Sequence, residues 1–232
     1  MSNIAIITAR GGSKRIPKKN IKEFCGKPII EYSIKAALNS GIFDEIMVST
    51  DSKEIAEIAL DCGAKVPFLR SAENSNDYAT TADVLLEVIN SYEKLGQVFN
   101  TLCCIYPTAP FVSSDKLICA YKGMKDKQGD SAMTVVKYSF PPQRALVIRN
   151  GKLEYQYPEY CNTRSQDLEP IYHDCGQFYF CDVESLKKYR TVVTPNCVPY
   201  IVPEEEVQDI DNESDWNLAE IKYIASKKRE NN

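Results

Sequence analysis

Residues 4–20 read Ile-Ala-Ile-Ile-Thr-Ala-Arg-Gly-Gly-Ser-Lys-Arg-Ile-Pro-Lys-Lys-Asn, an apolar run that leads into a basic, glycine-containing segment. The apolar residues Ile4 to Ile7 are typical of a strand that is buried on both faces, and the glycines follow where the chain must turn. Five of the ten residues from Arg10 to Lys19 are cationic, although the formal net charge of the whole chain is -4. This concentration of positive charge needs a local reason.

A phosphate-binding loop is one explanation of the basic segment. Glycines allow backbone N–H groups to converge on an anion, and Lys and Arg add charge and further donors, so the segment suits a di- or triphosphate. It matches neither the Walker pattern nor the Gly-x-Gly-x-x-Gly dinucleotide fingerprint. A basic surface turn between a strand and a helix is the alternative that chemistry alone leaves open.

Strands and helices are predicted to alternate through the first half of the chain. Apolar runs and end signals predict strands at 4–7, 45–50, 66–69 and 101–106, and helices from Pro28 to Gly41, from Asp51 or Ser52 to Cys62, from Thr80 or Thr81 to Leu95, and from Ser113 or Ser114 toward Gln128. Alternation of this kind indicates an α/β fold, with a mostly parallel sheet between two layers of helices. Ligands of such sheets bind beyond the carboxyl ends of the strands, where the basic segment, Ser49 to Asp51 and Pro107 to Pro110 all fall.

The pattern changes after Ser131. Strands are predicted at 132–138, 145–149 and 153–157, the last two joined by an Asn150-Gly151 turn, and then at 176–181, 198–202 and 206–210, with a short helix at 183–189. The polar segment from Pro158 to Cys175 has no periodicity, which is typical of a lid or an interface. Asn212 is predicted to cap a last helix with Asp215 at its third position, and apolar residues are expected to hold that helix on the core, namely Leu218, Ile221 and Ile224.

Composition limits the class of protein. The 232 residues are enough for one substantial core, so a single domain over residues 1–232 is expected. No apolar run approaches a membrane span, and Met1 to Asn3 lead directly into a strand, which favours a cytoplasmic protein with no membrane partner. A pI near 5.3 argues against nucleic acid as a partner. The nine cysteines are odd in number and include no Cys-x-x-Cys, so reduced structural thiols are expected.

Several motifs, in order along nearly the whole chain, resemble those of one enzyme family. They are Ala9 to Lys14 with Ile16-Pro17 and Lys19-Asn20, Gly26 to Pro28, Ser49 to Asp51, Phe68 to Arg70, Pro107 to Pro110, and Asp209 to Asp211. The chain thereby resembles the sugar-acid cytidylyltransferases, which activate nonulosonic acids as CMP-sugars. Arg164 to Glu169, Tyr172 to Asp174 and Gly176 to Tyr179 look most like the pseudaminic acid branch.

The resemblance implies a fold, a reaction and an assembly. The fold is a three-layer Rossmann-like nucleotidyltransferase fold with a mixed, mostly parallel sheet, in which residues 138–175 form a dimerisation arm that reaches the active site of the partner in a homodimer. The reaction joins CTP to a nonulosonic acid, pseudaminic acid by preference, and releases pyrophosphate. The alternatives are the same reaction on legionaminic acid, N-acetylneuraminic acid or an octulosonate, or a nucleotide-binding regulator without turnover.

The resemblance also assigns roles to residues. Nucleotide binding falls to Ala9, Arg10, Gly11, Gly12, Ser13, Lys14, Lys19, Asn20 and Arg70; sugar binding falls to Tyr106, Arg164, Gln166 and Asp174; catalysis falls to Lys14, Lys19 and Asp211. Many sialic acid members carry glutamine where this chain has Tyr106. An arginine suits the sugar acid because it grips a carboxylate through two hydrogen bonds. The single histidine, His173, is interpreted as a structural or sugar-contacting group rather than a base.

Asp209 and Asp211 are expected to hold Mg²⁺. On a strand, side chains two residues apart project from one face, so both carboxylates would point together while Ile210 faces the core. Mg²⁺ needs few carboxylates when phosphate oxygens complete its shell. A solvated acidic corner is the alternative, since Glu204 to Glu206 precede the pair.

Overall fold

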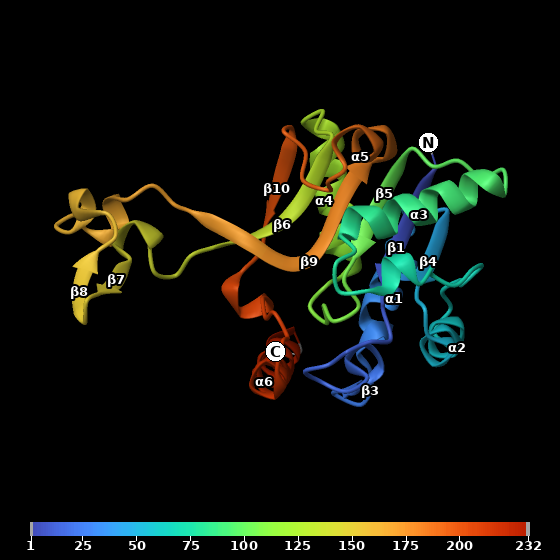
Figure 1. Ribbon diagram of the computed structural model, residues 1–232, viewed down its shortest axis with the longest axis horizontal. Coiled ribbons are helices and arrows are strands. Elements are labelled where there is room, and N and C mark those ends of the chain that lie inside the picture. The colour runs from blue at the N-terminus through green and yellow to red at the C-terminus, as the bar shows by residue number, and fades with distance from the viewer. Residues whose placement is uncertain (1, 231–232) are drawn as a thin grey trace.

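The computed structural model describes residues 2–230, which form a six-stranded mixed sheet with helices on both faces (Figure 1). The strands are β1 (Asn3–Thr8), β4 (Glu45–Ser49), β5 (Thr101–Ile105), β6 (Ser131–Lys137), β9 (Tyr172–Asp182) and β10 (Cys197–Ile201). Their order across the sheet is β10-β6-β9-β5-β1-β4, and only the two pairings of β9 are antiparallel. The predicted three-layer, Rossmann-like α/β fold with a mostly parallel sheet is therefore confirmed.

The apolar run in β1 lies at the centre of this arrangement. β1 pairs with β4 on one side and β5 on the other, and Ile4 to Ile7 are all fully buried. Because strand side chains alternate between faces, Ala5 and Ile7 enter one hydrophobic cluster while Ile4 and Ile6 enter another. This is why the run has no polar alternation.

Two layers of helices cover these clusters. The helices are α1 (Ile29–Ser40), α2 (Lys53–Asp61), α3 (Thr81–Lys94), α4 (Ser114–Asp126), α5 (Val183–Tyr189) and α6 (Glu213–Glu230). Apolar residues of α1, α2 and α4 pack on one face of the sheet, and those of α3 and α5 pack on the other. The predicted caps are present: Ser52, Thr80 and Ser113 each accept a hydrogen bond from the first turn of the helix that follows.

Three loops meet at the carboxyl edge of β1, β4 and β5. The backbone N–H of Ala9 donates to the carbonyl of Ser49 at 2.9 Å, which ties the end of β1 to the end of β4. The N–H of Arg70 donates to the carbonyl of Thr50 at 2.8 Å, which brings the segment before α3 to the same edge. The basic loop, the 70–80 segment and the loop after β5 are thus side by side, as parallel strand topology requires.

An arm between β6 and β9 projects away from the sheet (Figure 1). It contains the antiparallel hairpin β7 (Leu146–Arg149) and β8 (Lys152–Tyr155), and its turn residues Asn150 and Gly151 both have positive φ. The predicted hairpin is confirmed, with strands slightly shorter than expected. Several of its apolar side chains are exposed, including Ile148 at 75% and Leu153 at 68%.

Two predicted strands are wrong. At 66–69 no strand forms, because the chain leaves the edge of β4 directly after an isolated bridge between Lys65 and Met47. At 206–210 no strand forms. A 3-10 turn, Glu204–Glu206, includes the first residue of the segment. Side chains, in place of a neighbouring strand, donate to two of the segment's carbonyls: Gln177 to Glu206 O at 2.6 Å and Lys222 to Val207 O at 2.7 Å.

The predicted buried face of α6 is also wrong. Leu218, Ile221 and Ile224 are 44%, 65% and 49% exposed, whereas Trp216 and Ala219 are buried. Trp216 packs edge-on against Phe24, with ring centroids 5.6 Å apart. The predicted cap is correct, because Asn212 and Asp215 exchange backbone-to-side-chain hydrogen bonds.

The cysteines are free thiols, and Cys103 and Cys104 are fully buried in β5. Burial raises the pKa of both thiols, so they behave as small apolar side chains. In residues 2–230, none of the helices combines the length and the apolar character needed to cross a bilayer.

Candidate active site

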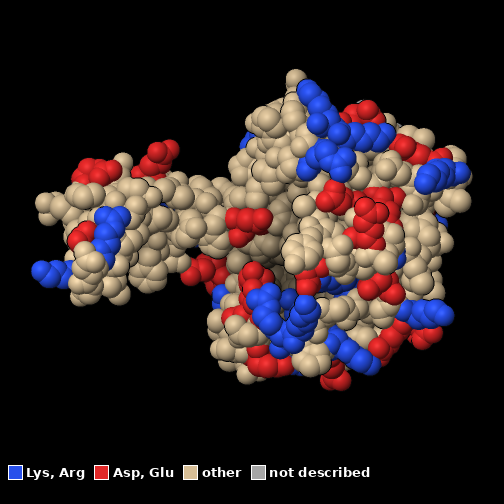
Figure 2. Space-filling model, viewed as in Figure 1, with Lys and Arg blue, Asp and Glu red and all other residues tan. Residues whose placement is uncertain are grey.

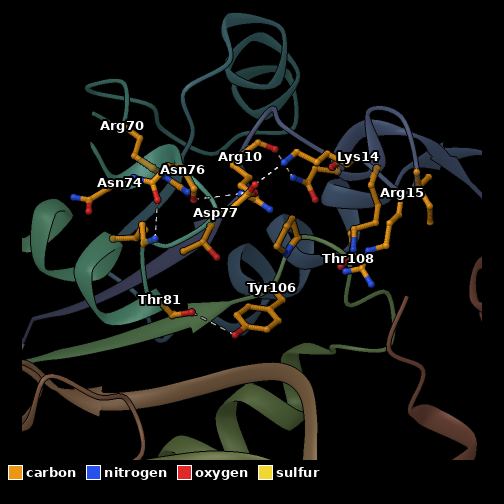
Figure 3. Close-up of a pocket in the computed structure, with 18 of the residues that line it drawn as sticks. Arg10, Lys14, Arg15, Arg70, Asn74, Asn76, Asp77, Thr81, Tyr106 and Thr108 are labelled. Atoms are coloured by element: carbon orange, nitrogen blue, oxygen red, sulfur yellow. Dashed lines mark hydrogen bonds and ion pairs between the residues drawn. The ribbon is translucent and has the colours of Figure 1, made fainter. Parts of the chain in front are cut away.

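A cavity of about 540 Å³ opens at the carboxyl edge of the sheet (Figure 3). Its walls come from the basic loop after β1, the segment between Arg70 and α3, the loop after β5 and the segment before α6. The lining residues are Thr8, Arg10, Ser13, Lys14, Arg15, Ile16, Lys19, Asn20, Arg70, Asn74, Asn76, Asp77, Ala79, Thr81, Val84, Tyr106, Pro107, Thr108 and Asp211. In the space-filling view, Lys and Arg side chains gather around a hollow in the body of the molecule (Figure 2).

Cationic side chains outnumber carboxylates in this cavity. The cations are Arg10, Lys14, Arg15, Lys19 and Arg70, and the carboxylates are Asp77 and Asp211. Asp77 pairs with two of the cations, Arg10 at 2.6 Å and Lys14 at 2.5 Å. The excess of positive charge on one concave surface favours a polyanion such as a triphosphate.

Lys19 is the most enclosed lysine of the basic loop. Its Nζ donates to the carbonyl of Ile210 at 2.7 Å and lies 4.0 Å from a carboxylate oxygen of Asp211, which also pairs with Arg15 at 2.7 Å. Burial lowers the pKa of Lys19, and the charges of Asp211 and Asp209 oppose that effect only in part. The Lys19 ammonium group, together with Arg15, therefore joins the basic loop to the segment before α6.

The Arg70 side chain is fixed by two hydrogen bonds to Ser49. Its Nε donates to Ser49 Oγ at 3.0 Å and its Nη2 to the carbonyl of Ser49 at 2.5 Å. Burial lowers its pKa, yet a guanidinium remains charged in proteins. Arg70 therefore presents a fixed positive charge to the cavity, and its nucleotide role stays a prediction.

The other predicted nucleotide residues fall into two groups. Ser13 and Asn20 line the cavity, and the Asn20 amide donates to the carbonyl of Arg10 at 2.8 Å, so it also holds the loop in shape. Ala9, Gly11 and Gly12 lie outside the set of described residues that line it.

Gly11 contacts the residues just before α2. Its N–H donates to the Asp51 carboxylate at 2.8 Å, so this donor faces the start of α2 instead of a bound anion. A Cβ at Gly11 would lie 3.1 Å from Ser52 Cβ. The absence of a side chain at Gly11 therefore allows the loop to pack closely on the start of α2.

A second cavity of about 560 Å³ adjoins the first, and Tyr106 lines both. It is lined by Tyr106, Val136, Lys137, Ser139, His173, Asp174, Cys175, Gly176, Tyr179, Glu204, Val207, Gln208, Asp209 and Lys222. Asp174 accepts hydrogen bonds from Gly176 N at 2.8 Å and Tyr179 Oη at 2.6 Å. The Tyr106 ring lies 5.4 Å from that of Tyr179, and its hydroxyl is 3.5 Å from Thr81 Oγ1. Tyr106 thus lies where the two cavities meet.

Asp209 and Asp211 do not share one strand face as predicted, because their segment is not a strand. Asp211 lines the first cavity and Asp209 lines the second, while Ile210 between them is buried as expected. Both negative charges act on Lys19, and each cavity has one of the two carboxylates in its wall.

Arg164 and Gln166 lie in the arm, beyond the walls of either cavity of the same chain. Arg164 is exposed and pairs with Asp167 at 2.7 Å. His173 lines the second cavity, where its Nδ1 lies 2.8 Å from the carbonyl of Asp174 and its ring packs on Tyr138.

Sequence reasoning missed Arg15, Asp77, Thr81, Lys137 and Lys222 as cavity residues. Arg15 could have been found, because it belongs to the same cationic cluster as Lys14. The others carry no local signal, since they reach the cavities only through tertiary packing.

Comparison with known proteins decides the family. The family model described as Cytidylyltransferase matches residues 4–178. The chain belongs to the cytidylyltransferase family. It is 41% identical to pseudaminic acid cytidylyltransferase of Campylobacter jejuni, over 96% of this chain and 97% of that protein. It is 31% identical to CMP-N,N'-diacetyllegionaminic acid synthase of Legionella pneumophila, over 95% of each chain.

The fold agrees with solved cytidylyltransferases. A structure of CMP:2-keto-3-deoxy-manno-octonic acid synthetase complexed with CTP superposes with a TM-score of 0.71 at 18% identity, covering 98% of this chain and 100% of that chain. These relations confirm two predictions: the family that the motifs indicated, and the enzyme class, a cytidylyltransferase.

Proposed function

We propose that this cytidylyltransferase transfers CMP from CTP to pseudaminic acid and releases pyrophosphate. The observation that carries the proposal is a pair of adjoining cavities that share Tyr106, one strongly cationic and the other polar and next to Asp174. The 41% identity to a pseudaminic acid cytidylyltransferase supports the choice of sugar. The whole chain acts as one catalytic domain, in the cytoplasm.

The chemistry needs positioning and charge more than covalent participation by the protein. The anomeric hydroxyl oxygen of the sugar forms a bond to the α-phosphorus, the bond from that phosphorus to the bridging oxygen breaks, and the hydroxyl proton is lost to solvent or a neighbouring base. Lys14 and Lys19 stabilise the negative charge that grows on the departing pyrophosphate. Arg10, Ser13 and Arg70 hold the nucleotide in the cationic cavity.

Asp209 and Asp211 are the residues that would hold Mg²⁺. Within residues 2–230, no cluster of three or more acidic, histidine or cysteine side chains is suited to a metal. A pair of carboxylates is nevertheless a sufficient protein share for Mg²⁺, which takes one or two of them together with substrate phosphates and water. Asp211 in the wall of the cationic cavity and Asp209 in the wall of the adjoining cavity would provide that share. When bound, Mg²⁺ would neutralise phosphate charge and orient the triphosphate.

The sugar would occupy the second cavity. Tyr106 at its inner end and Asp174 on its wall offer hydroxyl and carboxylate groups for the sugar's polar substituents. Tyr179 fixes the Asp174 carboxylate through a hydrogen bond of 2.6 Å, so this acceptor is preorganised. Legionaminic acid, N-acetylneuraminic acid and an octulosonate are the competing substrates.

The arm supports a homodimer. Exposed apolar side chains such as Phe140 at 88% and Ile148 at 75% would be covered by a second copy. Arg164 and Gln166, which lie outside the walls of both cavities of their own chain, would then reach the sugar site of the partner. An arginine delivered in this way suits the sugar carboxylate.

A pyrophosphate-release assay tests the function. Purified protein is incubated with CTP, Mg²⁺ and, separately, pseudaminic, legionaminic and N-acetylneuraminic acids and an octulosonate. The proposal requires the highest kcat/KM with pseudaminic acid. A higher value with another acid would change the substrate, and CTP binding without release of pyrophosphate from any acid would indicate a regulator.

A further inference from the structure

The carboxylate of Asp77 is seated on two cations of the basic loop (Figure 3). Its Oδ1 lies 2.6 Å from Arg10 Nη1 and its Oδ2 lies 2.5 Å from Lys14 Nζ, so one carboxylate bridges both side chains. The Arg10 guanidinium also donates to the carbonyl of Asn76 at 3.3 Å. The hydrogen bonds from Lys14 and Arg10 lower the pKa of Asp77, so it is ionised at neutral pH. An internal anion thus occupies cations that suit a phosphate.

Residues 72–79, which include Asp77, form a thin wall with open space on both sides. A third cavity, of about 740 Å³, lies behind it, and Asn74, Asn76 and Ala79 line both this outer cavity and the nucleotide cavity. Tyr78 is 93% exposed. The wall can therefore move outward without disturbing the hydrophobic core.

The ends of this wall are anchored independently of the basic loop. On one side, Glu87 accepts hydrogen bonds from Ser71 N at 2.7 Å and Ser71 Oγ at 2.8 Å. On the other side, Thr80 and Asp83 form the capping box of α3. Between these anchors, Asn76 and Asp77 provide the hydrogen bonds that cross to the basic loop. Release of Asp77 would therefore remove its ion pairs to the basic loop while leaving both anchors, and the hydrogen bond from the Asn74 amide to Glu87, in place.

We propose that Asp77 is an internal competitor for the pyrophosphate end of the nucleotide, which must displace its carboxylate from Arg10 and Lys14 in order to bind. The inference rests on the proposed function, because it takes Arg10 and Lys14 as triphosphate ligands. When the bond between the α- and β-phosphates has broken, Asp77 competes with pyrophosphate for the same cations and promotes its release. Asp77 thereby lowers the affinity of every ligand that binds these two cations, and it does so by one common factor. CMP lacks the β- and γ-phosphates, so it does not meet this competition.

The test is calorimetric titration of the wild type, Asp77→Asn and Glu73→Gln with pyrophosphate, CTP and CMP at fixed ionic strength. Glu73 is a matched control, because it is an acidic residue of the same segment that lines only the outer cavity. Asp77→Asn should bind pyrophosphate and CTP tighter by a similar factor, about three- to tenfold for two solvent-exposed ion pairs, and CMP within about twofold of wild type. Glu73→Gln should leave all three affinities within about twofold.

Three results would overturn the inference: unchanged or weaker pyrophosphate binding by Asp77→Asn, an equal gain in Glu73→Gln, or an equal gain for CMP. The first result would show that Asp77 shapes the loop for binding. Either of the other two would show that the gain in affinity comes from the change in net charge alone. The titrations need no sugar acid. Tighter pyrophosphate binding by Asp77→Asn in an enzyme that accepts no nonulosonic acid would contradict the proposed function alone.

Discussion

Replacing Lys19 with alanine is expected to lower kcat/KM for CTP by about 10- to 150-fold. A hydrogen bond from a charged group to an ionised partner contributes about 1.5–3 kcal/mol, and each 1.36 kcal/mol is about tenfold in rate. Lys19 is well placed to make such a bond, because its side chain is only 23% exposed and already donates to the carbonyl of Ile210.

The fold should survive this substitution. Loss of the hydrogen bond to Ile210 O should lower the free energy of unfolding by about 1 kcal/mol. Removal of a desolvated ammonium group offsets part of that loss. For a domain of this size, the melting temperature should fall by at most about 4 °C.

Lys18 provides the matched control for Lys19. It is the adjacent residue of the same loop, but its Nζ pairs with Glu54 at 2.7 Å on the side of α2, and its side chain is 66% exposed. Initial rates of pyrophosphate release at varied CTP, with saturating sugar and Mg²⁺, would be measured for Lys19→Ala, Lys18→Ala and wild type. Activity of Lys19→Ala within about threefold of wild type, or an equal loss in Lys18→Ala, would refute the role of Lys19 in stabilising the polyphosphate.

Four further outcomes are expected. Burial lowers the pKa of Lys19 below its ordinary 10.5. The alkaline fall in kcat/KM should therefore begin at a lower pH than it would if Lys19 had the ordinary pKa. Lys19→Arg should move that fall to higher pH, because a guanidinium stays charged. Between the lowered pKa of Lys19 and 10.5, the folded state binds fewer protons than the unfolded state. The contribution of Lys19 to the free energy of unfolding should therefore rise with pH through that window, which denaturant titrations at several pH values can measure. Mixing Arg164→Ala subunits with Lys14→Ala subunits should restore activity in heterodimers, and an active monomer at high dilution would exclude a shared site. Asp209→Asn and Asp211→Asn should each greatly raise the Mg²⁺ concentration required for half-maximal rate with little change in melting temperature, whereas an unchanged requirement in both would place the metal elsewhere.

Features governed by neighbouring residues were predictable from the sequence. The strand at Ile4 to Ile7 was identified from its unbroken apolar run, and the helix starts at Ser52, Thr80 and Ser113 from a side-chain oxygen that reaches the first turn. These effects act over a few residues, so no knowledge of the rest of the chain is needed. The basic loop was also predictable, because its charge and glycines are contiguous.

Only the tertiary structure decided which of the competing local arrangements formed. In α6, the stripe of Leu218, Ile221 and Ile224 is as apolar as many buried faces, yet Trp216 was buried because Phe24 lies opposite it. The pairing of Asp77 with Lys14 joins residues 63 positions apart, through loops that meet only when β1, β4 and β5 are aligned. Contacts of this kind depend on the relative positions of whole elements, and those positions are set by packing across the sheet, which no local pattern of residues encodes.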